Sequence, residues 1–155
     1  NTAQNNPGRA NVFKHNGGSI ILDFAHNVAG MDAIIHLAKS YVTDGGRFGI
    51  LFGNTGDRMY LTDKITDLII KSKPDIVVIK ELTSYLRGIQ PGVLVGQILG
   101  ALVSKGLGKD KVLIVDNELE ALDIVLDFVK NGDAFLFLAH ESISEVIDKL
   151  KAITK

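Results

Sequence analysis

Residues 47–80 read RFGILFGNTGDRMYLTDKITDLIIKSKPDIVVIK, and this stretch decides the fold. A short apolar run at 47–52 is followed by a segment whose apolar residues recur at spacings of three and four, and then by a second apolar run at 75–80. A helical segment between two short apolar strands is typical of a β-α-β unit in a parallel sheet. Because both runs are apolar almost throughout, we expect strands that are buried on both faces of the sheet.

The same alternation extends to both sides of this unit. Further strands are expected at 10–14, 19–23, 111–115 and 134–138, and helices over the apolar stripes at 31–42, 94–103, 119–129 and 143–150. The turn HNGG at 15–18 joins the first two strands and is short enough to permit only antiparallel pairing. The expected fold is therefore α/β: a Rossmann-like three-layer domain with a six-stranded, mostly parallel sheet and one antiparallel edge strand.

The sequence also predicts which strands are buried and where some of the helices begin. The runs at 111–115 and 134–138 are also strongly apolar, so burial on both faces is expected there as well. Pro91 suits the first turn of a helix, where its missing N–H is harmless. Two pairs have the spacing of a capping box at a helix start, namely Asn117 with Glu120 and Ser142 with Glu145.

Length and composition describe one ordinary globular domain. The 155 residues are 46% hydrophobic and 23% charged, with a formal net charge of -1. No net positive field is available for nucleic acid, and the absence of cysteine excludes a disulfide framework and a thiol nucleophile. No apolar run approaches the length of a membrane span, so we expect a cytoplasmic protein without a membrane partner.

The first residues differ from the rest of the chain. They are polar, begin without Met and contain Pro7 and Gly8, a composition typical of a linker between domains. We therefore expect residues 1–8 to be an interdomain linker and residues 9–155 to be one domain of a longer protein.

Ligands of open α/β sheets bind beyond the carboxyl ends of the strands, so the loops there are the candidate sites. Asp23, His26 and Asn27 follow the strand at 19–23. A carboxylate at a strand end can hold the vicinal hydroxyls of a ribose, and His26 is close enough to face the same crevice. Alternatively, Asn27 caps the helix and Asp23 closes an Asx turn.

The loop GNTGDR at 53–58 follows the next strand. Its two glycines allow the backbone to approach a ligand, and Asp57 with Arg58 can hold a zwitterion or a phosphate. A flexible turn with a surface ion pair is the alternative. The chain has no Walker A pattern, and no Gly-x-Gly-x-x-Gly follows a strand, so a conventional phosphate or dinucleotide site is not expected.

Two later loops carry charged side chains. Arg87 offers a planar guanidinium suited to a carboxylate. Glu141, which follows His140 at a helix start, either binds an ammonium group or simply favours the helix dipole. The four scattered histidines make no recognisable metal set, and no Gly-x-Ser-x-Gly elbow is present, so a self-contained hydrolase is not expected.

Three stretches, taken in order, resemble the carboxy-terminal domain of the Mur ligase superfamily, and within it the cyanophycin synthetase branch. They are PGRANVF at 7–13, LDFAHN at 22–27 and GDR at 56–58. The likeness covers nearly the whole chain. It implies part of a ligase in which ATP phosphorylates a carboxylate and an incoming amino group attacks the acyl phosphate.

The resemblance also implies roles for single residues. Arg9 is expected at the ATP phosphates, Asp23 at the ribose hydroxyls, and His26 and Asn27 beside the nucleotide. A looser assignment places five residues at the incoming amino acid or the closed interface: Asp57, Arg58, Arg87, His140 and Glu141. Val28 departs from the proline that many relatives have there.

The implied partners are ATP with Mg²⁺, an amino-acid or peptide substrate, and the central Mur ligase domain of the same polypeptide. That domain is expected to supply the P-loop and most metal ligands, so the isolated domain is expected to be inactive. A second hypothesis is a stand-alone Rossmann-like module that binds a nucleotide or metabolite without catalysis. Such a module is expected to bind nucleotide measurably by itself, whereas a severed ligase domain is expected to bind it weakly or not at all.

Overall fold

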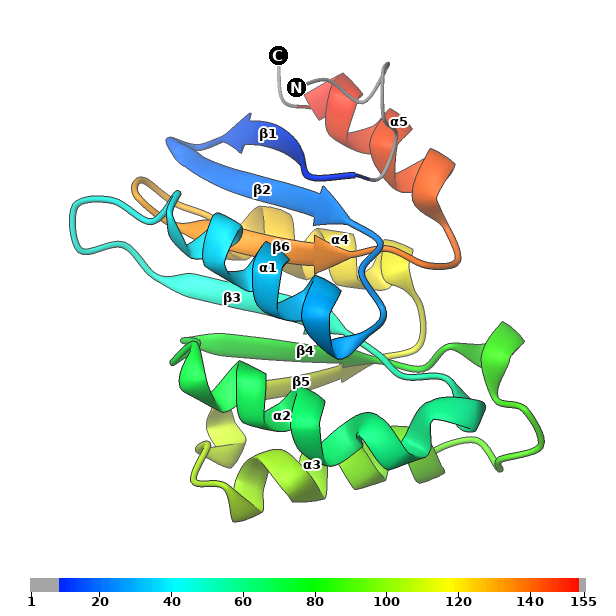
Figure 1. Cartoon of the computed structure of the whole chain (residues 1–155). Coiled ribbons are helices and arrows are strands. Elements are labelled where there is room, and N and C mark those ends of the chain that lie inside the picture. The colour runs from blue at the N-terminus through cyan, green and yellow to red at the C-terminus, as the bar shows by residue number, and fades with distance from the viewer. Residues whose placement is uncertain (1–8, 154–155) are drawn as a thin grey trace.

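The structure is a computed structural model that describes residues 9–153, so the expected linker at 1–8 lies outside the described residues. Six strands form one sheet in the order β1-β2-β6-β3-β4-β5 (Figure 1). Edge strand β1 pairs antiparallel with β2, and the other four pairs are parallel, which confirms the predicted sheet. The strands are β1 (Asn11–His15), β2 (Gly18–Asp23), β3 (Phe48–Phe52), β4 (Ile76–Lys80), β5 (Val112–Val115) and β6 (Ala134–Leu138).

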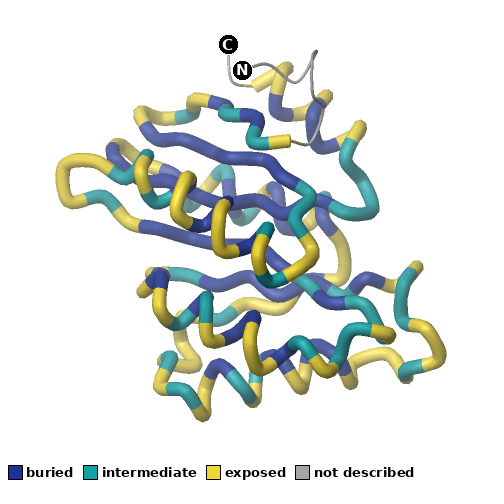
Figure 2. Tube along the Cα trace, viewed as in Figure 1, coloured by how far each residue is buried: buried dark blue, intermediate teal, exposed yellow. Residues whose placement is uncertain are grey.

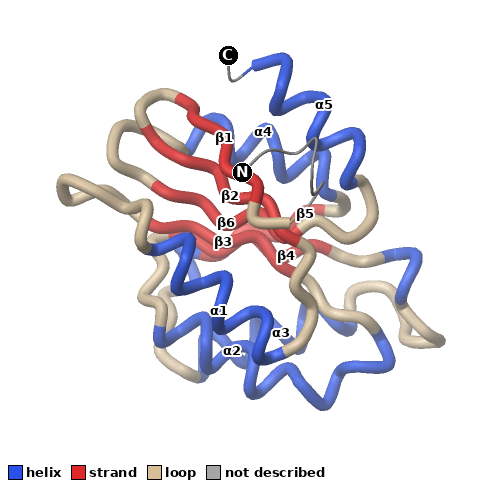
Figure 3. The backbone as a smooth tube through the Cα atoms, turned by 45° about the horizontal axis from the view of Figure 1, so that its top comes forward, coloured by secondary structure: helices blue, strands red, loops and turns tan. Residues whose placement is uncertain are grey.

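Helices cover both faces of the sheet (Figure 3). One face carries α1 (Val28–Lys39), α2 (Thr62–Lys71) and α3 (Val93–Ser104), and the other carries α4 (Glu118–Phe128) and α5 (Ile143–Ile153). Short 3-10 turns lie in the connections: η1 (Gly56–Leu61), η2 (Thr83–Tyr85) and η3 (Lys109–Lys111).

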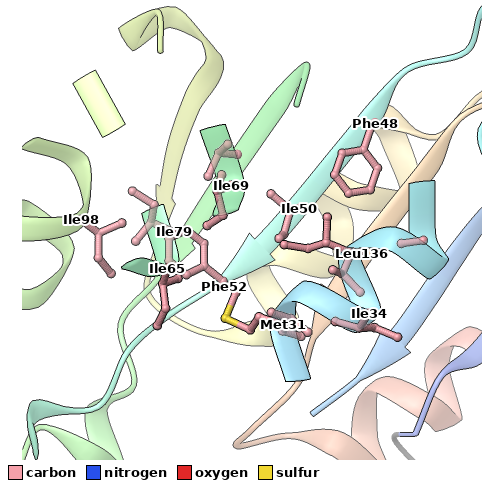
Figure 4. Close-up of a cluster of buried hydrophobic side chains, with 14 of the residues drawn as sticks. Met31, Ile34, Phe48, Ile50, Phe52, Ile65, Ile69, Ile79, Ile98 and Leu136 are labelled. Carbon is pink, nitrogen blue, oxygen red and sulfur yellow. The ribbon is translucent and has the colours of Figure 1, made fainter. Parts of the chain in front are cut away.

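Each face of the sheet has its own apolar core, because successive strand residues point to opposite faces. Toward α1, α2 and α3, Ile50 and Ile79 pack in one cluster with Ile69 of α2 (Figure 4). Toward α4 and α5, the neighbouring strand residues Leu51 and Val78 belong to a second cluster. Burial of apolar surface on both faces stabilises the sheet and holds the strand ends in a fixed register.

The outer strand β5 differs from the expectation of burial on both faces. Leu113 and Ile114 are 42% and 50% exposed, because β5 forms the edge of the sheet. The same expectation is confirmed for β3 and β6, which are buried throughout and lie in the interior of the sheet (Figure 2). An apolar run does not distinguish a central strand from an edge strand, since strand order depends on how the helices pack.

Of the predicted helix starts, the one at Asn117 is confirmed and the one at Pro91 is not. Asn117 caps α4 by accepting a hydrogen bond from the Glu120 N–H at 2.8 Å, and the Glu120 carboxylate accepts from the Asp116 N–H. The expectation for Pro91 is wrong, because α3 begins at Val93. Gly92 takes the N-cap position with a left-handed backbone (φ 89°), so the proline lies before the helix.

Candidate functional site

Three cavities lie among the loops that follow the carboxyl ends of the strands. The Asp23 cavity, of about 220 Å³, is lined by Arg9, Asp23, Phe24, Ala25, His26, Asn27 and Gly30. The central cavity, of about 290 Å³, is lined by His26, Gly53, Asn54, Thr55, Asp57, Arg58, Leu82, Tyr85, Arg87 and His140. The Glu141 cavity, of about 240 Å³, is lined by residues 140–145. His26 joins the first cavity to the second, and His140 joins the second to the third.

The Asp23 cavity brings together the four residues expected at the nucleotide, although they come from two chain segments. Arg9 precedes β1, whereas Asp23, His26 and Asn27 follow β2. The antiparallel pairing of β1 with β2 places the two segments side by side. The Arg9 guanidinium lies 4.6 Å from the centre of the Phe24 ring, a cation–π contact.

Asp23 also has a structural role. Its Oδ1 accepts the Ala10 N–H at 2.9 Å, and its Oδ2 accepts the Ala25 N–H at 2.9 Å, so the predicted Asx turn is present. The Asn27 side chain accepts the Gly30 N–H at 2.7 Å and caps α1, as the alternative reading expected. Each carboxylate oxygen of Asp23 has a further lone pair, so these bonds leave acceptor capacity for a ligand hydroxyl.

The glycines of the loop at 53–58 serve backbone packing. A Cβ on Gly56 would lie 1.7 Å from the Leu86 carbonyl oxygen, and a Cβ on Gly53 would lie 2.7 Å from the Lys80 carbonyl oxygen. The neighbouring chain therefore occupies the Cβ side of both glycines, and Gly53 also lines the central cavity. The two loops are thereby held against each other around the central cavity.

Charged side chains from both loops line the central cavity. Arg87 Nε lies 3.7 Å from Asp57 Oδ1, and both side chains are more than half exposed. Arg58 donates to the His26 carbonyl oxygen at 3.2 Å, which links this loop to the Asp23 cavity. The Thr55 hydroxyl, and to a smaller extent Arg87 and Arg58, lower the pKa of Asp57. Two guanidinium groups beside one carboxylate suit an anionic or zwitterionic ligand.

His140 contributes a neutral ring to the same cavity. Its Nε2 lies 2.9 Å from the Ala25 carbonyl oxygen, which can only accept, so Nε2 carries the proton. Burial, together with the positive charge of Lys80, lowers the pKa of His140 to about 4. The buried Nδ1 is then an acceptor, and it has no hydrogen-bond partner within residues 9–153.

Glu141 does not line the central cavity with the other expected substrate residues. Asp57, Arg58, Arg87 and His140 line the central cavity, whereas Glu141 lines the Glu141 cavity. Its Oε2 accepts the Ser84 N–H at 2.9 Å, so it ties the loop after β6 to η2.

Sequence reasoning missed a buried ion pair beneath these loops. Lys80 ends β4 and Glu118 begins α4, and their side chains are both 0% exposed, with 2.5 Å between Nζ and Oε2. The one available signal was a lysine at the end of the otherwise apolar run IVVIK. Its partner could not be identified, because the two residues are distant in sequence.

Neither a metal-binding cluster nor a membrane-spanning helix is found among residues 9–153. Within that range, no group of three or more His, Asp or Glu side chains is arranged to hold a metal ion. None of the helices described is both long and apolar enough to cross a membrane.

The fold is a Rossmann-like α/β domain with cavities at the carboxyl edge of its sheet. The family described as Mur ligase, glutamate ligase domain, matches residues 8–140. The chain belongs to this family, which confirms the resemblance of its three sequence motifs.

Relatives of known activity support the assignment. Cyanophycin synthetase of Crocosphaera subtropica is 30% identical over 151 residues, which are 94% of this chain and 16% of that protein. UDP-N-acetylmuramoyl-L-alanyl-D-glutamate--2,6-diaminopimelate ligase of Clostridium botulinum is 24% identical, over 92% of this chain and 29% of that protein. The chain thus spans only 16 to 17% of the cyanophycin synthetases that it matches.

Solved structures share the fold. A UDP-N-acetylmuramoyl-L-alanyl-D-glutamate--2,6-diaminopimelate ligase superposes with a TM-score of 0.68 at 18% identity, over 94% of this chain and 32% of that one. The bifunctional folylpolyglutamate synthase/dihydrofolate synthase of Yersinia pestis gives 0.66 at 17%, over 94% and 31%. A single domain of a putative ligase from Haemophilus ducreyi gives 0.61 at 18%, over 95% of this chain and 100% of that one.

Proposed function

We propose that this domain completes the ATP site and binds the incoming amino acid in an ADP-forming acid–amino acid ligase. In that reaction a carboxylate takes the γ-phosphoryl group of ATP, and an amine then displaces phosphate from the acyl phosphate and loses a proton. The observation that carries the proposal is that His26 joins two cavities, one lined by the expected nucleotide residues and the other by the guanidinium groups of Arg58 and Arg87. Nucleotide and amine can therefore bind side by side at one edge of the sheet.

On the nucleotide side, Asp23 and Arg9 have complementary tasks. Asp23 is held by two backbone N–H groups, so its carboxylate is oriented before a ribose arrives. A carboxylate oriented in this way suits a vicinal diol. Arg9 lies just before β1, and its planar guanidinium suits phosphate oxygens.

On the amine side, the central cavity suits an amino acid. Arg58 and Arg87 can hold its carboxylate through their guanidinium groups, and Asp57 can attract its ammonium group. The neutral His140 offers Nδ1 as an acceptor for an N–H group of the amine. Each of these side chains is suited to a polar end of the substrate, and the apolar Leu82 also lines the cavity.

The domain is proposed to act by closing over a nucleotide held mainly by the central domain. Asp57 and Arg87 are more than half exposed, so a second surface is needed to exclude water from a hydrolysable acyl phosphate. The Yersinia pestis relative is described in complex with AMPPNP and Mn ion, which supports ATP with a divalent metal as the cofactors. Most Mg²⁺ ligands are assigned to the central domain, as the family resemblance implies, and the residues described in this structure include no group of three or more metal-ligating side chains.

Substitutions in the full-length protein test the nucleotide assignment. Asp23→Ala is expected to raise the KM for ATP about tenfold or more through the lost ribose contact, and Arg9→Ala to slow ADP formation in a single turnover. Asp148→Ala, at an exposed position of α5, is the matched control and is expected to change neither. Unchanged ATP kinetics in both site variants would remove the proposed nucleotide site.

Calorimetry on the 155-residue chain separates this proposal from a stand-alone binding module. The ligase domain by itself is expected to bind ATP weakly or not at all, because the central domain that is proposed to hold the phosphates is not present in the experiment. Tight ATP binding by this chain, without amide formation by the full-length protein, would favour the module.

A further inference from the structure

A buried ion pair lies beneath the site, and the proposed function does not use it. The side chains of Lys80 and Glu118 are fully buried. Both residues lie at the carboxyl edge of the sheet, where Lys80 is the last residue of β4 and Glu118 is the first residue of α4. Burial lowers the pKa of Lys80 to about 8, partly offset by Glu118. Burial by itself raises the pKa of Glu118, but Lys80 and backbone N–H groups outweigh it and the net shift is downward.

This pair holds the loop after β6 through its backbone. The Glu118 carboxylate accepts the N–H groups of His140, Glu141 and Ser142, at 2.6, 3.1 and 2.8 Å. Lys80 Nζ donates to Glu118 and also to the carbonyl oxygen of Leu138, the last residue of β6. Three residues of the loop and the last residue of β6 are therefore bound to two side chains from other elements.

The held loop carries side chains that reach both neighbouring segments. His140 bonds to the Ala25 carbonyl oxygen in the turn after β2, and Glu141 accepts the Ser84 N–H in η2. His140 lines the central cavity and Glu141 lines the Glu141 cavity. A shift of the loop by a fraction of an ångström would move walls of both cavities together.

Stability alone is a poor reason for such a pair. Replacing a buried ion pair with apolar residues of similar volume is often neutral or stabilising, since desolvation offsets the attraction between the charges. Here, however, an apolar residue at position 118 would leave three backbone N–H groups without their acceptor. The carboxylate is needed for the shape of this loop, and Lys80 is needed to keep that carboxylate charged in a buried place.

We propose that Lys80 and Glu118 are positioning residues for the amino-acid subsite. They hold residues 138–142 so that His140 stays neutral against Ala25 and presents its ring to the central cavity. This inference rests on the proposed function, because the subsite is the one assigned there to the incoming amine.

The test compares Glu118→Gln with a matched substitution at the other end of β6. Asp133 is also a buried carboxylate that accepts backbone N–H groups, from Arg47 and Lys130, and it pairs with Arg47 at 2.7 Å. Asp133→Asn therefore removes a comparable charge far from the cavities. Lys80→Met is a second variant at the site: it leaves the Glu118 side chain in place but removes the ammonium group that keeps this carboxylate charged and that binds the Leu138 carbonyl oxygen.

In the full-length protein, KM is measured for ATP and for the best amino acid among the proteinogenic set and 2,6-diaminopimelate. Glu118→Gln is expected to raise the amino-acid KM about tenfold or more while the KM for ATP changes less than about twofold. Asp133→Asn is expected to change neither. Equal amino-acid KM values in Glu118→Gln and Asp133→Asn would overturn the inference, whatever the loss of stability.

Amide hydrogen exchange on the 155-residue chain gives a readout that needs no substrate. Exchange at His140, Glu141 and Ser142 is expected to be faster in Glu118→Gln and Lys80→Met than in the wild type, and unchanged in Asp133→Asn. Unchanged exchange at these amides in Glu118→Gln would overturn the inference. An absence of amide formation by the wild-type protein would instead refute the proposed function, and exchange would still decide whether the pair holds the loop.

Discussion

The two edges of the sheet hold their loops in different ways. At the amino edge, Asp133 binds the start of β3 and the turn before β6, and the backbones of Gly46 and Gly132 are in close contact. At the carboxyl edge, Glu118 also binds backbone N–H groups, but the loops around it surround cavities. Backbone packs against backbone at both edges, at Gly46 and Gly132 on one and at Gly56 and Leu86 on the other, but at the carboxyl edge the loops also surround cavities.

This difference shows how one sheet combines stability with a binding site. The same device, a buried carboxylate with a cationic partner, closes the amino edge and holds an open carboxyl edge. Loops beyond the carboxyl ends of parallel strands diverge toward different helices, so they leave space for a ligand. We expect substitutions at the amino edge to cost stability alone, and those at the carboxyl edge to change binding as well.

The largest expected effect is at the amino edge. A Cβ on Gly46 would lie 2.0 Å from the Gly132 carbonyl oxygen, so Gly46→Ala is expected to lower the free energy of unfolding by about 4 kcal/mol. Gly45→Ala is the control: its φ is +74° but its Cβ would meet nothing within 4 Å, so a loss of about 1 kcal/mol is expected. Urea denaturation measures both. Equal losses would show that the close packing at this edge can relax.

The next effect is a pH dependence of the free energy of unfolding that arises at the carboxyl edge and not at the amino edge. The pKa of His140 is about 4 in the folded chain, below the ordinary value of 6.5, so the unfolded chain binds this proton more readily between these pH values. The free energy of unfolding is therefore expected to fall by about 2 to 3 kcal/mol as the pH falls from 6.5 to 4.5. The contribution of Asp133, whose pKa is lowered from 3.8, persists throughout that window.

His140→Gln isolates this effect. Its free energy of unfolding is expected to depend less on pH between 6.5 and 4.5 than that of the wild type, while Asp133→Asn keeps the wild-type slope in this window. Urea denaturation at several pH values measures the slopes. A wild-type slope in His140→Gln would contradict the assignment of the acid sensitivity to the carboxyl edge.

The smallest effect compares two helix caps that both lie at the carboxyl edge. Asn27→Ala and Asn117→Ala each remove an N-cap oxygen and are expected to cost about 1 kcal/mol of unfolding free energy. Asn27 lines the Asp23 cavity, so only Asn27→Ala is expected also to raise the KM for ATP of the full-length protein. A matching rise in Asn117→Ala would show that cap loss acts through general loosening of this edge.

Much of this architecture was predictable from local patterns. Alternating apolar runs and helical stripes identified the strands and the main helices, and the HNGG turn identified the antiparallel pair. Three ordered motifs identified the family, as the match over residues 8–140 confirms. The exposed residues of β5 were not predictable, because the sequence of an edge strand can be as apolar as that of a central one.

The sequence identified most of the residues that line the cavities, but few of the contacts that position them. Arg9, Asp23, His26 and Asn27 do line one cavity. Of the two bonds that orient Asp23, the Asx turn to Ala25 was expected, whereas the bond from the Ala10 N–H was not. The sequence identifies Gly56 as a loop glycine, but its close contact with the Leu86 carbonyl oxygen depends on a loop distant in sequence. The roles of these residues in catalysis stay predictions.

Periodicity, turn chemistry and motif order are properties of neighbouring residues, so the chain alone was enough to determine its elements, its sheet type and its family. Strand order, the adjoining cavities and the Lys80–Glu118 pair exist only in the folded protein. The physical reason is that each depends on packing between segments far apart in the chain. Burial then sets the charge state of groups such as His140, whose pKa is a property of its surroundings in the fold.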